Sequence, residues 1–202
     1  MQAEGYKVKT STKGEGHMGD RRDRQNTRYL KLSDYVILAM LAAMGIASKV
    51  IIVPLAQVIT GPLFIPGGVV AGGFFMMFII LGTAITGKLG AALLMSLVQA
   101  VLVTITGTFG SHGAASLLTY TFPGLAVEVW FFLSRHRGCC PVCCFIGGMV
   151  ANVAGTVAVN LAIFNLSLIP LLLSMAVAAL SGGLGGLVAS SIARNLKKLE
   201  IL

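Results

Sequence analysis

A stretch of about 160 residues that carries only five charged side chains constrains the fold of this chain most strongly. Between residues 35 and 193, the charged residues are Lys49, Lys88, Glu128, Arg135 and Arg137. In the whole chain of 202 residues, 11% are charged, against about 25% in a typical soluble domain. Because such a segment cannot cover its surface with charge, we expect that lipid surrounds it.

The apolar segment has room for six membrane-spanning helices, since one span needs about 20 mostly apolar residues. Gly, Pro and charged residues divide it into continuous apolar runs. Such runs are typical of helices rather than of barrel strands, in which hydrophobicity alternates. The predicted fold class is therefore an all-α integral membrane protein, a bundle of six transmembrane helices. The expected spans are 35–55, 68–86, 89–106, 115–134, 142–164 and 167–192.

The placement of Lys and Arg predicts the orientation, because short basic loops stay on the cytoplasmic side. Basic residues occur before the first span, at Lys88, in 135–137 and after residue 193. The alternate connections, 56–67, 107–114 and 165–166, contain neither Lys nor Arg. Both the N-terminus and the C-terminus are therefore expected to be cytoplasmic.

The two ends of the chain differ from the six-helix transmembrane domain at 35–193. Residues 1–34 are expected to form a disordered basic cytoplasmic tail, which is too long and hydrophilic for a signal peptide. Residues 194–202 are expected to form a short cytoplasmic C-terminus. Although the formal net charge is +8, no basic surface interleaved with aromatic residues accompanies it, so no nucleic-acid partner is expected.

Glu128 is the only acidic residue between Asp34 and Glu200. It lies seven residues before Arg135, about 10 Å of helix rise inside the expected cytoplasmic boundary. An ionisable group within a span usually faces a cavity or a partner, which makes Glu128 a candidate for substrate binding. The alternative is a carboxyl group that burial protonates, or one that pairs with Arg135 or Lys88.

Amide side chains lie at similar depths in two other expected spans. Gln99 is near the middle of the third span, and Asn152 and Asn160 form a stripe with Thr156 on the fifth. Together with Glu128, these groups could line one substrate pocket from three spans. Alternatively, the amides connect neighbouring helices by hydrogen bonds.

Two further candidates for substrate binding lie toward the outer side. Lys49 is about 22 Å of helix rise beyond Asp34, and its alternative role is to snorkel to the outer interface. His112 is either solvated or on the rim of a pocket, and a single His cannot define a metal site. The apolar connection at 56–67 is expected to fold back as a lid over an outward-facing cavity.

Motifs for enzymatic chemistry are absent from the sequence. It has no Gly-rich phosphate loop, no H-E-x-x-H and no G-x-S-x-G, so neither an ATPase nor another enzyme is expected. The cysteines cluster at 139–144, and a single cluster matches the ligand spacing of a zinc site poorly. We therefore expect no metal and no cofactor.

Small residues recur four apart in the first span, at Ala39, Ala43 and Ala47. Such spacing lets the backbones of two helices approach closely. The face they form serves either packing within the chain or contact with a partner.

Four stretches of the sequence carry a resemblance to a known family, namely 73–78, 87–93, 124–128 and 181–186. Most of the chain between residues 32 and 198 resembles the substrate-binding S components of energy-coupling factor (ECF) vitamin transporters. It is nearest the YkoE-type subgroup, which is associated with thiamine or its hydroxymethylpyrimidine precursor. Gln99 departs from that subgroup, because a carboxylate is expected in the third span.

The resemblance implies a substrate-capture subunit of an ATP-driven importer in a prokaryotic plasma membrane. Its partners would be a membrane coupling (T) subunit, which contacts the face formed by Ala39, Ala43 and Ala47, and two ABC ATPase subunits. The ligand would be a vitamin or precursor, such as thiamine or hydroxymethylpyrimidine. The alternative function is an autonomous secondary transporter or small channel, in which Glu128 relays a proton or cation.

Overall fold

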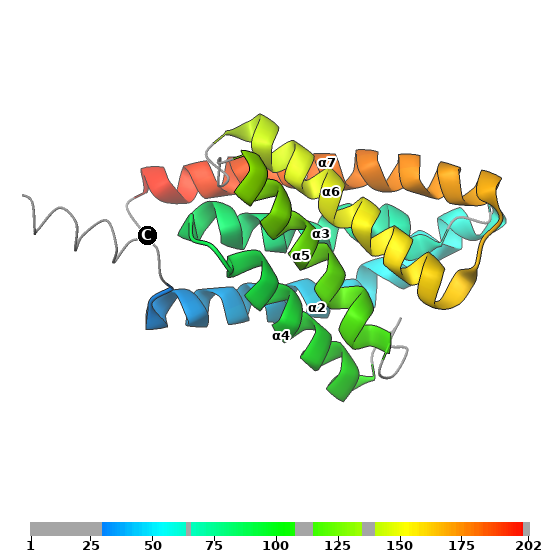
Figure 1. Ribbon diagram of the computed structural model, residues 1–202, viewed down its shortest axis with the longest axis horizontal. Coiled ribbons are helices and arrows are strands. Elements are labelled where there is room, and N and C mark those ends of the chain that lie inside the picture. Colours follow the sequence, from blue (N-terminus) through cyan, green and yellow to red (C-terminus); the bar gives the residue numbers. More distant parts are fainter. Residues whose placement is uncertain (1–29, 64–65, 108–114, 135–139, 200–202) are drawn as a thin grey trace, which may run out of the picture.

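The protein is a bundle of helices (Figure 1). The computed structural model describes residues 30–63, 66–107, 115–134 and 140–199, and every regular element in them is helical. The elements are α2 (Leu32–Thr60), a 3₁₀ turn (Gly61–Leu63), α3 (Gly67–Thr86), α4 (Ala91–Thr106), α5 (Ala115–Ser134), α6 (Pro141–Val159), a π turn (Asn160–Phe164) and α7 (Leu168–Lys198).

Five of these helices are long and apolar enough to cross a membrane, namely α2, α3, α5, α6 with its π turn, and α7. The sixth, α4, has 16 residues and a length of about 24 Å, slightly short for a perpendicular span. The prediction of an all-helical membrane protein is confirmed. Its orientation in the membrane stays a prediction.

The observed helix ends differ most from the expected ones at the ends of α2 and α7. α2 continues past residue 55 to Thr60, because Pro54 removes one N–H donor without ending the helix. α7 extends beyond residue 192 to Lys198 as a polar final turn, which a search for apolar runs does not detect. The expected lid at 56–67 is thus mostly helix and turn.

The basic connections that the structure describes gather at one end of the bundle. Lys88, between α3 and α4, forms an ion pair of 2.5 Å with Asp34 at the start of α2. Near the end of α7, the Lys197 ammonium donates a hydrogen bond of 2.8 Å to the carbonyl oxygen of Ala84 in α3. Figure 1 shows this end at the left, where α2 begins and α7 ends.

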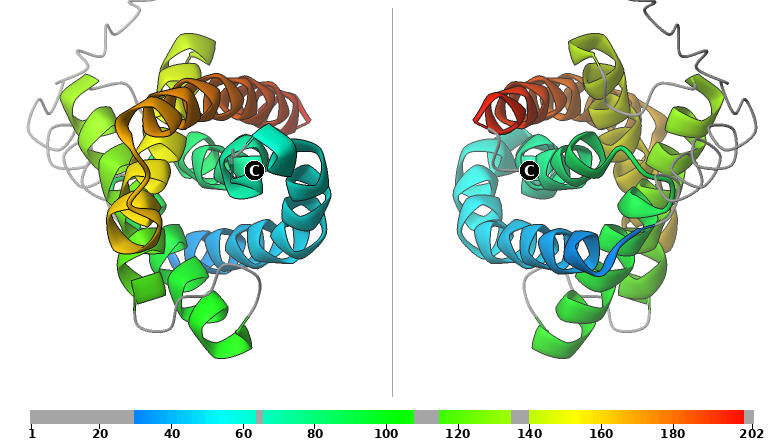
Figure 2. Two further views of the ribbon diagram at one scale, coloured as in Figure 1. Left: turned by 90° about the vertical axis from the view of Figure 1, so that its right-hand side faces the viewer. Right: turned by 90° about the vertical axis from the view of Figure 1, so that its left-hand side faces the viewer.

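Helix α3 is buried along most of its length and lies between α2, α6 and α7 (Figure 2). Glycines allow the close approach of its neighbours. A Cβ atom at Gly73 would overlap the carbonyl oxygen of Ser181 in α7, and one at Gly185 would overlap that of Gly73. Similarly, Gly148 of α6 and Gly182 of α7 lie directly against each other's backbone. These contacts pack α3, α6 and α7 closely against one another.

Candidate functional site

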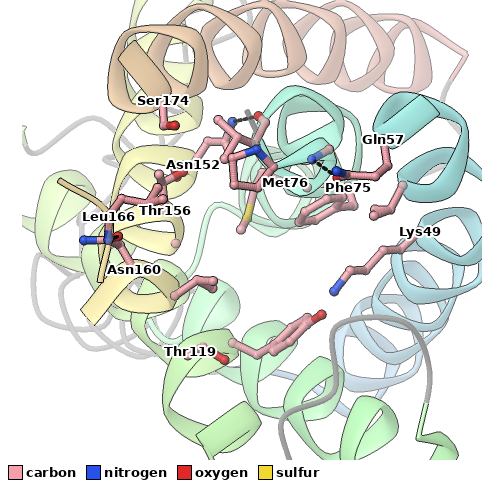
Figure 3. A pocket seen from close by; sticks show the side chains of 18 residues that line it. Lys49, Gln57, Phe75, Met76, Thr119, Asn152, Thr156, Asn160, Leu166 and Ser174 are labelled. Atoms are coloured by element: carbon pink, nitrogen blue, oxygen red, sulfur yellow. Dashed lines mark hydrogen bonds between the residues drawn. The ribbon is translucent and has the colours of Figure 1, made fainter. Parts of the chain in front are cut away.

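A cavity of about 210 Å³ lies among α2, α3, α5, α6 and α7. The connections α2–α3 and α6–α7 contribute Pro66 and Leu166 to its wall, so it lies toward the end opposite the Asp34–Lys88 ion pair. Its walls are largely apolar, with Val53, Phe75 and Met76 among the lining residues. Figure 3 shows polar side chains on two facing sides of this space.

Among the described residues that line the cavity, Lys49 is the only charged one. Its side chain is 8% exposed and reaches from α2 into the space (Figure 3), rather than snorkelling to an interface. The ammonium lies 4.3 Å from the ring centroid of Tyr120 and 5.6 Å from that of Phe75, which is cation–π geometry. Within the described residues, it makes neither a hydrogen bond nor an ion pair.

Asn152 and Asn160 also line the cavity, and both hold the backbone in place. The Asn152 amide nitrogen donates to the carbonyl oxygens of Val69 and Ala178, at 3.1 and 2.9 Å, and so connects α6 to α3 and α7. The Asn160 side-chain oxygen accepts a bond of 2.9 Å from the N–H of Leu166. The two roles proposed for these amides, lining a pocket and forming hydrogen bonds that hold the backbone, are therefore compatible, because each amide does both.

Two hydroxyl groups of the cavity were not among the residues expected from the sequence. The side-chain oxygens of Tyr120 and Ser174 are buried and have no hydrogen-bond partner in the part of the chain that the structure describes. Tyr120 comes from α5, and Ser174 comes from α7. Polarity at helical spacing could have pointed to both, because Ser116 and Tyr120 are four residues apart on α5, and Ser174 and Ser181 are seven apart on α7.

Gln57 joins the ends of two helices beside the cavity. Its side-chain oxygen accepts a hydrogen bond of 2.5 Å from the N–H of Gly67, at the start of α3. Both residues and Pro66 line the cavity, which leaves a small part of the expected lid in contact with it. Residues 64–65 lie outside the described part of the chain.

Glu128 and Gln99 do not line this cavity. The Glu128 carboxylate accepts a hydrogen bond of 2.9 Å from the N–H of Ala92, in the first turn of α4. A carboxylate there stabilises the positive end of the helix dipole. Gln99 is 2% exposed and lies against Gly45 of α2, and its amide nitrogen is without a partner among the described groups.

The remaining candidates are His112, which the structure does not describe, and the alanines of α2, which do not line the cavity. His112 belongs to residues 108–114, which the structure does not describe. Across the described ranges, no group of three or more His, Cys, Asp or Glu side chains is placed to hold a metal ion. Ala39, Ala43 and Ala47 are all exposed on α2, so they do not pack against the described helices.

Comparisons with known proteins bear on the fold and the family. One solved structure, described as an S-component of an ECF transporter, has 20% sequence identity to this chain. The match covers 86% of this chain and 88% of that one, with a TM-score of 0.71, which shows that the two share a fold. A comparison with curated proteins finds no match.

A family model covers residues 33–154, more than half of the chain. The family is described as the permease component of an ABC-type cobalt transport system. Membership makes this chain a multi-pass membrane protein of a transport system and not an enzyme. By this match, the chain belongs to the family of ABC-type cobalt transport system permease components.

Proposed function

We propose that this chain is the substrate-binding S subunit of an ATP-driven ECF-type importer and that it captures a small organic molecule. The observation that carries the proposal is the cavity itself. It is enclosed by five helices, apolar for most of its wall and supplied with a few converging polar groups, as small-molecule sites usually are. It lies toward the end away from the basic connections, which the distribution of Lys and Arg predicts to be outside.

An organic molecule suits this cavity better than a metal ion. The described residues that line it include neither His, Cys, Asp nor Glu, the side chains that bind cobalt and similar ions most strongly. A volume of about 210 Å³ is slightly below the usual range for drug-sized ligands. A compound with one ring or a short chain therefore fits the proposal.

The resemblance to YkoE-type proteins names two candidate compounds, hydroxymethylpyrimidine, which has one ring, and thiamine, which has two. Hydroxymethylpyrimidine is neutral, and its ring nitrogens can accept hydrogen bonds from Lys49 or Tyr120. Thiamine carries a permanent positive charge, for which the described cavity wall offers no carboxylate. Of the two, the pocket therefore supports the pyrimidine better.

Uptake would need partners, because this chain contains no nucleotide-binding loop. In the proposal, a T subunit contacts the exposed face formed by Ala39, Ala43 and Ala47, and two ABC ATPases supply the energy. Small residues at this spacing let a partner helix approach closely. Glu128 has no place in the transport path of this proposal, because its carboxylate holds the start of α4.

Uptake into proteoliposomes tests the proposed function. The purified chain would be reconstituted with or without the T subunit and ATPases, with ATP inside, and supplied with tritiated vitamins and hydroxymethylpyrimidine. We expect uptake of at least one compound only when all subunits and ATP are present. Uptake by the isolated chain, driven by an ion gradient, would instead establish a secondary transporter.

A further inference from the structure

We propose that the ligand of this cavity is a small organic acid whose carboxylate binds the ammonium of Lys49. This inference rests on the proposed function, since it names the chemical class of the molecule that the S subunit captures.

The first argument is the balance of charge around Lys49. Between Asp34 and Glu200, the sequence contains one acidic residue, Glu128. Its carboxylate accepts a bond from Ala92 and does not line the cavity, and Asp34 is paired with Lys88. The transmembrane part of this chain therefore has no carboxylate of its own to offer Lys49.

The second argument is the energetic cost of that position. A buried ammonium without a counterion is strongly unfavourable, and it has three N–H donors that need acceptors. The rings of Tyr120 and Phe75 supply cation–π attraction to the ammonium, but the ring faces accept no ordinary hydrogen bond. A ligand carboxylate would supply both the opposite charge and the acceptors.

The third argument concerns the number of charges. In the part of the cavity wall that the structure describes, Lys49 is the only cation. A phosphate group carries nearly two negative charges at neutral pH, and one would remain unbalanced in an apolar site. A monocarboxylate matches the single ammonium.

The remaining polar groups indicate what the rest of the acid looks like. The Tyr120 ring lies beside the ammonium, and its hydroxyl group needs a partner. Ser174, also without a partner among the described groups, lies across the cavity from Lys49 together with Asn160 (Figure 3). Phe75 and Met76 contribute apolar wall. The ligand is then an acid at one end, apolar in the middle and able to form hydrogen bonds at the far end.

Paired ligands that differ only in charge test this inference on the wild-type protein. In lipid nanodiscs, calorimetry would compare nicotinate with nicotinamide, biotin with biotinamide and lipoate with lipoamide, and would include thiamine and hydroxymethylpyrimidine. We expect an acid to bind and its amide to bind at least about 30-fold more weakly, the usual effect of breaking a buried charge pair. Small molecules that the purified protein retains would be identified by mass spectrometry after denaturation.

Substitutions of Lys49 and Lys88 test whether the preference for the acid over its amide comes from Lys49. Lys49→Met should weaken binding of the acid by a similar factor and leave the amide nearly unchanged, whereas Lys49→Arg should retain part of the preference. Lys88→Met removes the same kind of charge at the other end of the bundle and should leave the preference intact. If Lys49→Met does not fold, the comparison of acids with their amides on the wild-type protein still tests whether the ligand is an acid.

The outcomes separate this inference from the function on which it rests. If an amide, hydroxymethylpyrimidine or thiamine binds more tightly than every acid, or the retained molecule carries no acidic group, the inference is wrong and the S-subunit function stands. If no compound binds and no organic molecule is retained, the proposed function fails as well. A retained carboxylic acid outside the panel supports the inference.

Discussion

Lys49 and Glu128, two charged residues within the helices, differ in whether the protein itself supplies a partner. The Glu128 carboxylate receives a hydrogen bond from Ala92 at the start of α4, where the helix dipole also favours negative charge. Lys49 is buried beside aromatic rings and has no described acceptor. At the scale of single residues, the charged group that is available to bind a ligand is therefore the Lys49 ammonium, which is positive.

Replacing Glu128 should change stability rather than ligand binding. Glu128→Ala removes the acceptor at the start of α4 and should lower the free energy of unfolding by about 1 kcal/mol, as the loss of a helix cap does. Glu128→Gln keeps an acceptor oxygen and should cost less. Thermal unfolding in detergent and calorimetric affinity would be measured for both. A large loss of affinity in Glu128→Gln, at unchanged stability, would instead put the carboxylate in the binding site.

At the scale of helices, the packing of α3 against α7 depends on backbone contacts that glycine alone permits. The N–H of Gly73 donates to the Ser181 hydroxyl at 3.0 Å, and this hydroxyl in turn donates to the carbonyl oxygen of Val70. Because the Gly73 backbone lies directly against the carbonyl group of Ser181, an added methyl group would force the two helices apart.

Gly73→Ala and Gly68→Ala form a matched pair on α3. A Cβ atom at Gly73 would overlap the Ser181 carbonyl group, and we expect a loss of about 1 to 3 kcal/mol in stability. A Cβ atom at Gly68 would have no neighbour within 4 Å, so stability should stay the same or rise slightly. Thermal unfolding of the two variants measures the difference. Equal melting temperatures would show that the contact between α3 and α7 is looser than described.

The exposed alanine face of α2 should matter for coupling and not for binding. Ala43→Trp changes a side chain that points away from the described helices, so ligand affinity should stay within about twofold of the wild type, whereas ATP-driven uptake should be lost. Ala176→Trp, at an exposed alanine of α7, is the control and should retain uptake. Loss of binding in Ala43→Trp, or loss of uptake in both variants, would argue against a specific docking face.

At the scale of the whole molecule, hydropathy predicts the helices well because each spanning segment must satisfy its own backbone in lipid. That requirement is local, so six apolar runs indicate six helices without any knowledge of their contacts. The ends are less predictable, because Pro54 does not stop α2 and the polar last turn of α7 has no apolar signal.

The cavity was only partly predictable, because it is assembled from residues far apart in the sequence. Lys49, Asn152 and Asn160 were expected on account of their polarity within apolar spans, and the structure brings them to one space. Polarity alone could not separate these residues from Glu128, which meets a backbone N–H of another helix instead. Tyr120 and Ser174 became candidates only when the packing of α5 and α7 left their hydroxyl groups without partners.

The ligand that purified protein retains, compared between two tryptophan variants, tests the central claim most directly. Val53→Trp would fill the cavity, whereas Ile51→Trp places the same side chain two residues earlier, on an exposed part of α2. Denaturing mass spectrometry should recover one small organic molecule from the wild type and from Ile51→Trp, and none from Val53→Trp. Recovery of the same molecule from Val53→Trp, or of none from any of the three proteins, would contradict substrate capture in this cavity.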